Sequence, residues 1–437
     1  VTDKVQFGGA VLNGGLMEIS GGTIRNNNVG WRGAGIASYG KIEMTGGTIS
    51  GNYARNSWGD GGAIYLSGKK NDTGEDYTAS NASYCTIFDG NFTKNKSDGA
   101  GGAVCADGYS ILYVKGGTFE NNAAATTGGG INVYSSCLRM SDGKISGNTA
   151  VSTNGSTGFG GGLNLTAGSV ADITGGTIEN NQSNSGGGIY ANGKSSFTAS
   201  NLKITGNTAA TNGGGICIPG TKDYEYNVSL ENVLIQGNKS ESGCGAGIYA
   251  ARAWKEETST GVLTLKNCQI KENYSTVAGG GIYLDKGVTA TMDGGEISGN
   301  HVINPTSQTN GGGIAVGGTF TLNSGKISDN IKDGSWNGGA AASVSGTFTM
   351  NGGEVSGNID TCTAENAENR TIGGGAFYVL GGTLNINGGT ITNNTSHRGG
   401  AIAFHYGPYN RGTVHITGGK IVGNYVTGGE GGAINMT

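Results

Sequence analysis

The sequence predicts an all-β fold: a parallel β-helix solenoid with three short strands per coil and about 14 coils. Three observations predict it. A motif of the form GGxIxxN recurs along the chain, a second motif, GG[AG]I, falls between its copies, and segments of alternating apolar and polar residues precede many of the double glycines. No stretch shows helical periodicity, so these repeats indicate strands.

The first motif occurs as "GGTISGN" at 46–52 and, in exact or looser form, in fourteen copies. Successive copies lie 25 to 43 residues apart, a period typical of stacked repeats. We expect the final asparagines to stack on one another, with their amides hydrogen-bonded along a column. The predicted ladder consists of Asn27, Asn52, Asn95, Asn122, Asn148, Asn181, Asn207, Asn238, Asn273, Asn300, Asn330, Asn358, Asn394 and Asn424.

The position two residues after the isoleucine of this motif is usually glycine or asparagine. These are the residues that tolerate a left-handed backbone, so the sequence predicts a corner of the coil there. The isoleucine itself is predicted to lie in an inner column. The predicted corner residues are Asn26, Gly51, Asn121, Gly147, Asn180, Gly206, Gly237, Gly299, Gly357, Asn393 and Gly423.

The second motif and the alternating segments supply the other strands. "GGAI" at 61–64 continues to Leu66, with the apolar residues inward, and segments such as Phe320-x-Leu322 alternate with period two. Each repeat therefore predicts one strand at GG[AG]I, one in the alternating segment and one centred on the isoleucine of GGxIxxN.

Composition excludes several classes of protein. Ninety glycines occur without a Gly-X-Y period, which excludes collagen. The net charge is −4 and no basic run occurs, so no nucleic-acid partner is expected. No apolar stretch reaches the length of a membrane span. We expect residues 1–437 to form a single β-helix domain, a fragment of a longer surface protein, because the chain begins and ends within repeats.

Seven cysteines are scattered over different repeats without the spacing of a metal site. We interpret them as small packing residues, with a disulfide such as Cys244–Cys268 as the alternative. No metal and no cofactor is predicted.

The combination of "GGAV" (101–104) with "FTKN" (92–95) and "FENN" (119–122) resembles the repeat of the chlamydial polymorphic outer-membrane proteins. The repeats are also similar to those of large right-handed β-helix surface proteins, including bacterial adhesins, with a pectin-lyase-like fold. The resemblance implies a right-handed β-helix and an extracellular or bacterial cell-surface location. The same fold carries adhesins and polysaccharide-cleaving enzymes, so it does not decide the function.

Catalytic residues are not predicted. The motifs "NTD", "GHG" and "RIK" of pectin-degrading enzymes do not occur in the chain. A polysaccharide lyase or glycoside hydrolase remains the alternative, and it requires carboxylates to meet in a groove. The carboxylates considered for this role are Asp223, Glu225, Glu256, Glu257 and Asp285.

Candidate binding residues lie where the repeat pattern is interrupted and at an outward position after GG[AG]I. Tyrosine recurs at that position, and an exposed aromatic stripe can stack against sugars or anchor a protein. Loops after the GG[AG]I strand add aromatic residues, and a histidine-rich segment, 396–419, adds polar ones. The candidates are Tyr65, Tyr190, Tyr249, Tyr283, Trp254, Tyr224, Tyr226, His405, Tyr406 and Arg411.

From these features we expect a non-enzymatic surface adhesin or display β-helix that binds a glycan or a host protein. The enzyme described above is one alternative, and a purely structural stalk is another.

Overall fold

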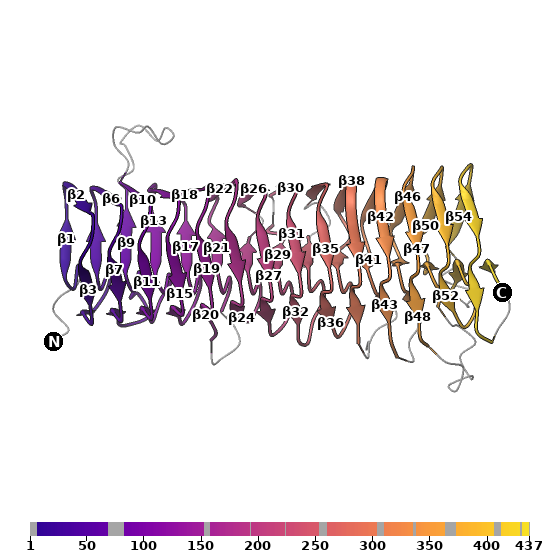
Figure 1. Ribbon diagram of the computed structural model, residues 1–437, viewed down its shortest axis with the longest axis horizontal. Coiled ribbons are helices and arrows are strands. Elements are labelled where there is room, and N and C mark those ends of the chain that lie inside the picture. The colour runs from indigo at the N-terminus through magenta and orange to yellow at the C-terminus, as the bar shows by residue number, and fades with distance from the viewer. Residues whose placement is uncertain are drawn as a thin grey trace. The chain divides into compact units, whose positions relative to one another are not determined.

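The structure is a computed structural model. It describes residues 7–68, 83–152, 158–192, 194–222, 224–252, 260–303, 310–334, 338–362, 373–405, 412–428 and 431–436. Contacts divide the chain into two units, Val1–Ala209 and Ala210–Thr437. In each unit the chain winds into coils whose equivalent strands pair in parallel, so that β7, β11 and β15, for example, lie side by side (Figure 1).

Sheet 1 is formed by the strands that begin at the GG[AG]I motifs, and all its described pairings are parallel and in register. In the first unit it contains β1 (Val11–Asn13), β5 (Ile36–Ser38), β9 (Ile64–Ser67), β13 (Val104–Asp107), β17 (Ile131–Tyr134), β21 (Leu163–Thr166) and β25 (Ile189–Ala191). In the second unit it contains β29 (Ile216–Pro219), β33 (Ile248–Ala251), β37 (Ile282–Leu284), β41 (Ile314–Val316), β45 (Ala342–Val344), β49 (Phe377–Val379), β53 (Ile402–Phe404) and β57 (Ile434–Asn435).

Sheet 2 receives two consecutive strands from most coils, the alternating segment and the GGxI segment. In the first unit the alternating strands are β2 (Leu16–Ile19), β6 (Lys41–Met44), β10 (Tyr84–Ile87), β14 (Ile111–Val114), β18 (Cys137–Met140), β22 (Val170–Ile173) and β26 (Ser196–Ser200). Their GGxI partners are β3 (Thr23–Arg25), β7 (Thr48–Ser50), β11 (Asn91–Thr93), β15 (Thr118–Glu120), β19 (Lys144–Ser146), β23 (Thr177–Glu179) and β27 (Lys203–Thr205).

In the second unit, two coils join both segments of sheet 2 into one long strand, β38 (Val288–Ser298) and β42 (Thr319–Ser328). The separate alternating strands are β30 (Tyr226–Glu231), β34 (Gly261–Lys266), β46 (Thr347–Met350), β50 (Thr383–Ile386) and β54 (Thr413–Ile416). The separate GGxI strands are β31 (Leu234–Gln236), β35 (Gln269–Lys271), β47 (Glu354–Ser356), β51 (Thr390–Thr392) and β55 (Lys420–Val422).

Sheet 3 is built of strands of two residues that directly follow the ladder asparagines. In the first unit they are β4 (Asn28–Val29), β8 (Tyr53–Ala54), β12 (Lys96–Ser97), β16 (Ala123–Ala124), β20 (Thr149–Ala150), β24 (Gln182–Ser183) and β28 (Thr208–Ala209). In the second unit they are β32 (Lys239–Ser240), β36 (Tyr274–Ser275), β39 (His301–Val302), β43 (Ile331–Lys332), β48 (Ile359–Asp360), β52 (Thr395–Ser396) and β56 (Tyr425–Val426). A further pair, β40 (Asn310–Gly311) with β44 (Gly338–Gly339), precedes sheet 1.

The fold is thus the expected right-handed parallel β-helix with three sheets, and each unit contributes seven ladder asparagines. The assignment of strands to sheets differs from the expectation. The alternating and GGxI segments share sheet 2, and the third sheet was missed because two residues are too few to show a period.

Apolar residues at equivalent positions of successive coils fill the core. The isoleucine of GGxIxxN stacks in register from coil to coil, for example Ile270 on Ile297 and Ile327. Where phenylalanine replaces it, Phe92 and Phe119 stack with ring centroids 4.7 Å apart. Burial of each side chain in this column, isoleucine or phenylalanine, stabilises the fold by about 1.5–3 kcal/mol.

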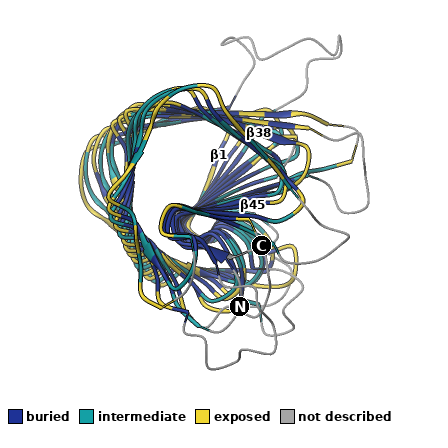
Figure 2. Cartoon of the chain, turned by 90° about the vertical axis from the view of Figure 1, so that its right-hand side faces the viewer, coloured by how far each residue is buried: buried dark blue, intermediate teal, exposed yellow. Residues whose placement is uncertain are grey.

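Burial differs between the sheets. β45 is buried along its whole length, whereas the first six residues of β38 alternate between buried and more exposed positions (Figure 2). Sheet 2 therefore presents one face to solvent, while both faces of sheet 1 are largely covered.

Candidate functional site

The corner of each coil has the predicted left-handed backbone. All eleven predicted positions have positive φ, with Asn121 at 55° and Gly51 at 62° as examples. Three further corners carry other residue types, Lys94 (55°), Glu272 (52°) and Asp329 (56°), which the sequence did not reveal. The backbone of these three residues adopts the same left-handed conformation, which is strained because each residue carries a Cβ that glycine lacks.

The ladder asparagines form a hydrogen-bonded column in each unit. Asn122 is fully buried and is representative. Its Nδ2 donates to Asn148 Oδ1 at 3.0 Å and to the carbonyl of Phe92 at 2.9 Å. Its Oδ1 accepts from both the backbone N–H and Nδ2 of Asn95, each at 3.0 Å. Every polar atom of the buried amide therefore has a partner, as a buried amide requires.

The tyrosines predicted to form an exposed stripe lie in one column of sheet 1, which we call the outer column. It consists of the residue that follows GG[AG]I in each coil. In the first unit its members are Leu12, Ala37, Tyr65, Cys105, Asn132, Asn164 and Tyr190. In the second unit they are Cys217, Tyr249, Tyr283, Ala315, Ser343, Tyr378, Ala403 and Asn435.

The expectation of an exposed tyrosine stripe was wrong for two of its five members. Tyr65 and Tyr378 have no exposed surface, and Tyr190, Tyr249 and Tyr283 are only half-buried. Tyr65 contacts Arg32 and Asp107, and Tyr378 contacts His405. The glycine turn before the strand also lies against the column. Gly186, at φ 67°, lies so close that a Cβ there would be 2.7 Å from Tyr190 Cβ.

Tyr65 lies in a polar cluster of the first unit. Arg32 donates to the Tyr65 hydroxyl at 2.6 Å, and that hydroxyl donates to Asp107 Oδ2 at 2.7 Å. Arg32 Nε lies 3.4 Å from Asp60 Oδ2, and its guanidinium carbon lies 4.8 Å from the centre of the Tyr65 ring. Two carboxylates, a guanidinium and a phenol therefore converge over Cys105.

Burial dominates the electrostatics of this cluster. Burial raises the pKa of Asp60, although the N–H of Ala100 and the charge of Arg32 act in the opposite direction. Burial, followed by the charge of Asp107, raises the pKa of Tyr65. Burial also raises the pKa of the Cys105 thiol. The cluster thus contains a carboxyl that holds its proton more strongly than usual.

Tyr249 and Tyr283 form a second cluster, in the second unit. Their rings stack with centroids 5.2 Å apart and planes within 7°. Arg252 Nε lies 3.8 Å from Asp285 Oδ2 on the same two coils. The two hydroxyls have no hydrogen-bond partner in the described part of the chain. Because the rings face each other, each covers one face of the other, and the hydroxyls remain as polar groups of the pair.

Other predicted aromatic residues are separated from this pair. Tyr190 stacks on Phe159, with ring centroids 4.5 Å apart. Tyr224 is exposed, as expected for a loop residue. Tyr226 was predicted in a loop, but it begins β30 and is buried. Its ring lies over Gly261 of the next coil, where a Cβ would overlap it.

The histidine-rich segment is only partly described. His405 Nδ1 lies 2.7 Å from the Tyr378 hydroxyl, and burial lowers the pKa of His405. Tyr406, Arg411 and Trp254 lie outside the described residues.

Three of the five carboxylates considered for an enzyme lie outside the described residues, namely Asp223, Glu256 and Glu257. Of the others, Glu225 accepts from Thr260 Oγ1 at 2.6 Å, and Asp285 pairs with Arg252.

No cluster of metal-ligating side chains occurs among the described residues, and all seven cysteines are free thiols. The predicted alternative of a Cys244–Cys268 disulfide is therefore wrong for this structure, since Cys268 Sγ instead donates to the carbonyl of Leu230. A helix of the length and apolarity needed to cross a membrane is not found in the described ranges.

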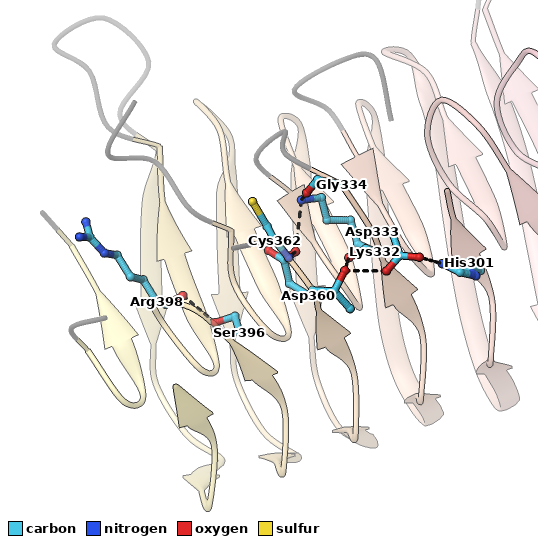
Figure 3. Close-up of polar contacts among 9 residues, drawn as sticks. His301, Lys332, Asp333, Gly334, Asp360, Cys362, Ser396 and Arg398 are labelled. Carbon is cyan, nitrogen blue, oxygen red and sulfur yellow. Dashed lines mark hydrogen bonds and ion pairs between the residues drawn. The ribbon is translucent and has the colours of Figure 1, made fainter. Parts of the chain in front are cut away.

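Sequence reasoning missed an ion pair inside sheet 3. Lys332 Nζ lies 3.2 Å from Asp360 Oδ1, and both side chains are fully buried (Figure 3). The two residues are directly paired on adjacent strands β43 and β48. The signal was available in the sequence, because the second residue after the ladder asparagine is valine, alanine or serine in all the remaining repeats.

The parallel sheets, the asparagine column and the left-handed corners define a right-handed β-helix repeat protein. Residues 160–324 match a family model described as a right handed beta helix region. A more particular likeness is that of residues 87–107 to the Chlamydia polymorphic membrane protein repeat, and this segment contains "FTKN" and "GGAV". Neither a curated protein nor a solved structure matches the chain.

Proposed function

We propose that this β-helix is displayed at a bacterial cell surface and binds a glycan or a host protein through sheet 1. The likeness of residues 87–107 to a repeat of bacterial membrane proteins supports the location. Protease treatment of intact cells tests it, because a displayed chain is cut while an internal marker protein stays intact.

The stacked pair Tyr249–Tyr283 is the observation that carries the binding proposal. Tyrosine and arginine supply much of the affinity at protein interfaces, because they combine a large apolar area with polar groups. Here two unpartnered hydroxyls lie on the adjacent strands β33 and β37, and the Arg252–Asp285 pair directly follows the ends of these strands. A rigid site loses little conformational entropy when it binds a partner.

A glycan array together with a panel of extracellular host proteins identifies the ligand. In the double variant Tyr249→Phe/Tyr283→Phe the rings still stack but the hydroxyls are lost, and we expect affinity to fall at least tenfold. Tyr113→Phe, which changes a half-buried tyrosine of β14 in sheet 2, is the matched control and is expected to bind normally. If no ligand of either class binds, the purely structural stalk replaces this proposal.

The second candidate function is cleavage of a polysaccharide, by lysis or hydrolysis. The Arg32–Asp60–Tyr65–Asp107 cluster favours it, since such reactions use a carboxyl that keeps its proton beside one that is ionised. Burial raises the pKa of the Asp60 carboxyl. Asp107 Oδ2 accepts from the Tyr65 hydroxyl at 2.7 Å and lies 3.7 Å from the Arg32 guanidinium, whose positive charge stabilises a carboxylate.

Release of reducing or unsaturated sugars from acidic and neutral polysaccharides tests this candidate. Asp107→Asn is expected to abolish release, while Asp172→Asn, an exposed carboxylate on sheet 2, is expected to leave it unchanged. No release by the unmodified protein would exclude the enzyme on the polymers tested. We further propose that residues 1–437 act as a single domain, which a single cooperative unfolding transition would support.

A further inference from the structure

The buried pair Lys332–Asp360 is out of place in its column. The inward position of sheet 3 in the second unit is otherwise occupied by small or apolar residues, Ser240, Ser275, Val302, Ser396 and Val426. Lys332 and Asp360 are the two charged residues at this position in the unit. They lie in direct register on adjacent coils, and their side chains have no exposed surface. A buried ion pair of this kind is expensive, because each charge loses its hydration.

Neighbouring groups do not neutralise the pair in another way. Asp333, one residue beyond Lys332, is held by His301 Nε2 at 2.5 Å and by Thr361 Oγ1 at 2.6 Å. The Ser396 hydroxyl of the next coil donates to the carbonyl of Arg398 at 2.6 Å (Figure 3). Among the described residues, Lys332 and Asp360 therefore form an ion pair only with each other.

The contacts of Asp360 are asymmetric. Its Oδ1 accepts from Lys332 Nζ at 3.2 Å and from the backbone N–H of Cys362 at 3.0 Å. Its Oδ2 is buried and has no partner among the described residues. Lys332 Nζ also donates to the carbonyl of Gly334 at 3.4 Å. One carboxyl oxygen is thus polarised by hydrogen-bond donors, while the other is free to carry a proton.

From this geometry we propose that Lys332 and Asp360 condense into an amide, an isopeptide bond that covalently joins two adjacent coils. A proton passes from the Lys332 ammonium to Asp360 Oδ2, which leaves a neutral amine facing a neutral acid. The dry interior favours this exchange, because neither product carries a charge that requires hydration. Burial raises the pKa of Asp360, which is consistent with the protonated acid.

In the condensation the lone pair of Nζ attacks Asp360 Cγ. The developing negative charge on Oδ1 is stabilised by the N–H of Cys362, as in an oxyanion hole. The Cγ–Oδ2 bond then breaks, and Oδ2 leaves as water with its own proton and one proton from Nζ. No oxidant or other reactant is needed. The fold holds the reacting groups together, which corresponds to an effective concentration of about 10⁵ M or more in well-oriented systems.

The mass of the intact, full-length protein tests the proposal directly and does not depend on the proposed binding function. We expect the purified folded chain to be lighter by one water molecule than its sequence. Digestion is expected to release one branched peptide in which Lys332 is joined to Asp360.

Variants locate the bond. Lys332→Met removes the nucleophile and is expected to restore the full mass. Asp360→Asn keeps the shape of the acceptor, so any bond that forms there must release ammonia instead of water. Asp333→Asn, which changes the adjacent carboxylate, is the control and is expected to keep the loss of water. A folded wild-type chain with its full mass, or a loss of water that persists in Lys332→Met, would overturn the proposal.

Discussion

Replacing Asn122 with alanine tests the ladder as a source of stability. The truncation removes the acceptor of two donors on the preceding coil, the backbone N–H and one Nδ2 proton of Asn95. Both donors are buried, and each buried donor without a partner costs about 1–3 kcal/mol. We therefore expect the free energy of unfolding to fall by about 2–6 kcal/mol.

Asn27 provides the matched control. It donates to Asn52 Oδ1 at 2.9 Å, but in the described residues nothing donates to its own Oδ1. Asn27→Ala therefore leaves no donor without a partner, and we expect it to cost about 1 kcal/mol or less.

Urea unfolding measures both costs, and hydrogen exchange of the segments 89–95 and 116–122 shows where the coil opens. In a solenoid the effect is expected to be local, because each coil contacts only its neighbours. If Asn122→Ala costs no more than Asn27→Ala, the polar atoms of the ladder do not stabilise the fold in the way we argue.

Three further predictions concern the corners and the titratable groups. Lys94→Gly relieves the backbone strain of a left-handed corner, so it is expected to raise the free energy of unfolding in urea by about 0.5–1 kcal/mol. Gly51→Ala introduces a Cβ 2.5 Å from Asn26 Oδ1 and is expected to lower that free energy. The pKa of Asp60 is raised in the folded state, so the unfolded chain loses this proton first, and the native protein loses stability as the pH rises above 3.8. The stability of Asp60→Asn relative to the wild type is therefore expected to increase above that pH. A difference in stability that does not change with pH would contradict the raised pKa of Asp60. Burial raises the pKa of Cys85 to about 12, so a thiol reagent is expected to label half-buried Cys137 first in the native protein, and Cys137→Ser is expected to remove the fast phase.

The inner architecture follows from the sequence because each of its positions is repeated many times. Ile49, Gly51 and Asn52 have equivalents in repeat after repeat, so their roles as core, corner and ladder residues emerge by comparison within one chain. Sheet 3 could not be predicted in this way. Its strands, such as Tyr53–Ala54, are only two residues long, and tertiary contacts rather than a local pattern define them.

The candidate sites were less predictable, because they depend on what covers a residue. The outward direction of Tyr65 and Tyr378 was readable, but their burial depends on three-dimensional packing against residues of other coils, such as Arg32 and His405. The partners of Tyr65, Arg32 and Asp107, come from different coils and have no fixed sequence relation to it. The Lys332–Asp360 pair was within reach of the sequence, but only after the position two residues beyond the ladder asparagine is aligned across the repeats.

The direction of the ladder has a consequence for how such a protein changes in length. Within each unit the bonds between ladder asparagines all run in one direction: the side-chain amide donates to the asparagine of the next coil, as Asn148 does to Asn181 and Asn300 does to Asn330. Each coil thus has a donating edge and an accepting edge, and all coils are oriented alike. Removing or duplicating one whole coil brings a donating edge against an accepting edge again. Gene rearrangements that insert or delete a complete repeat therefore preserve the column, so selection can adjust the reach of the protein one coil at a time.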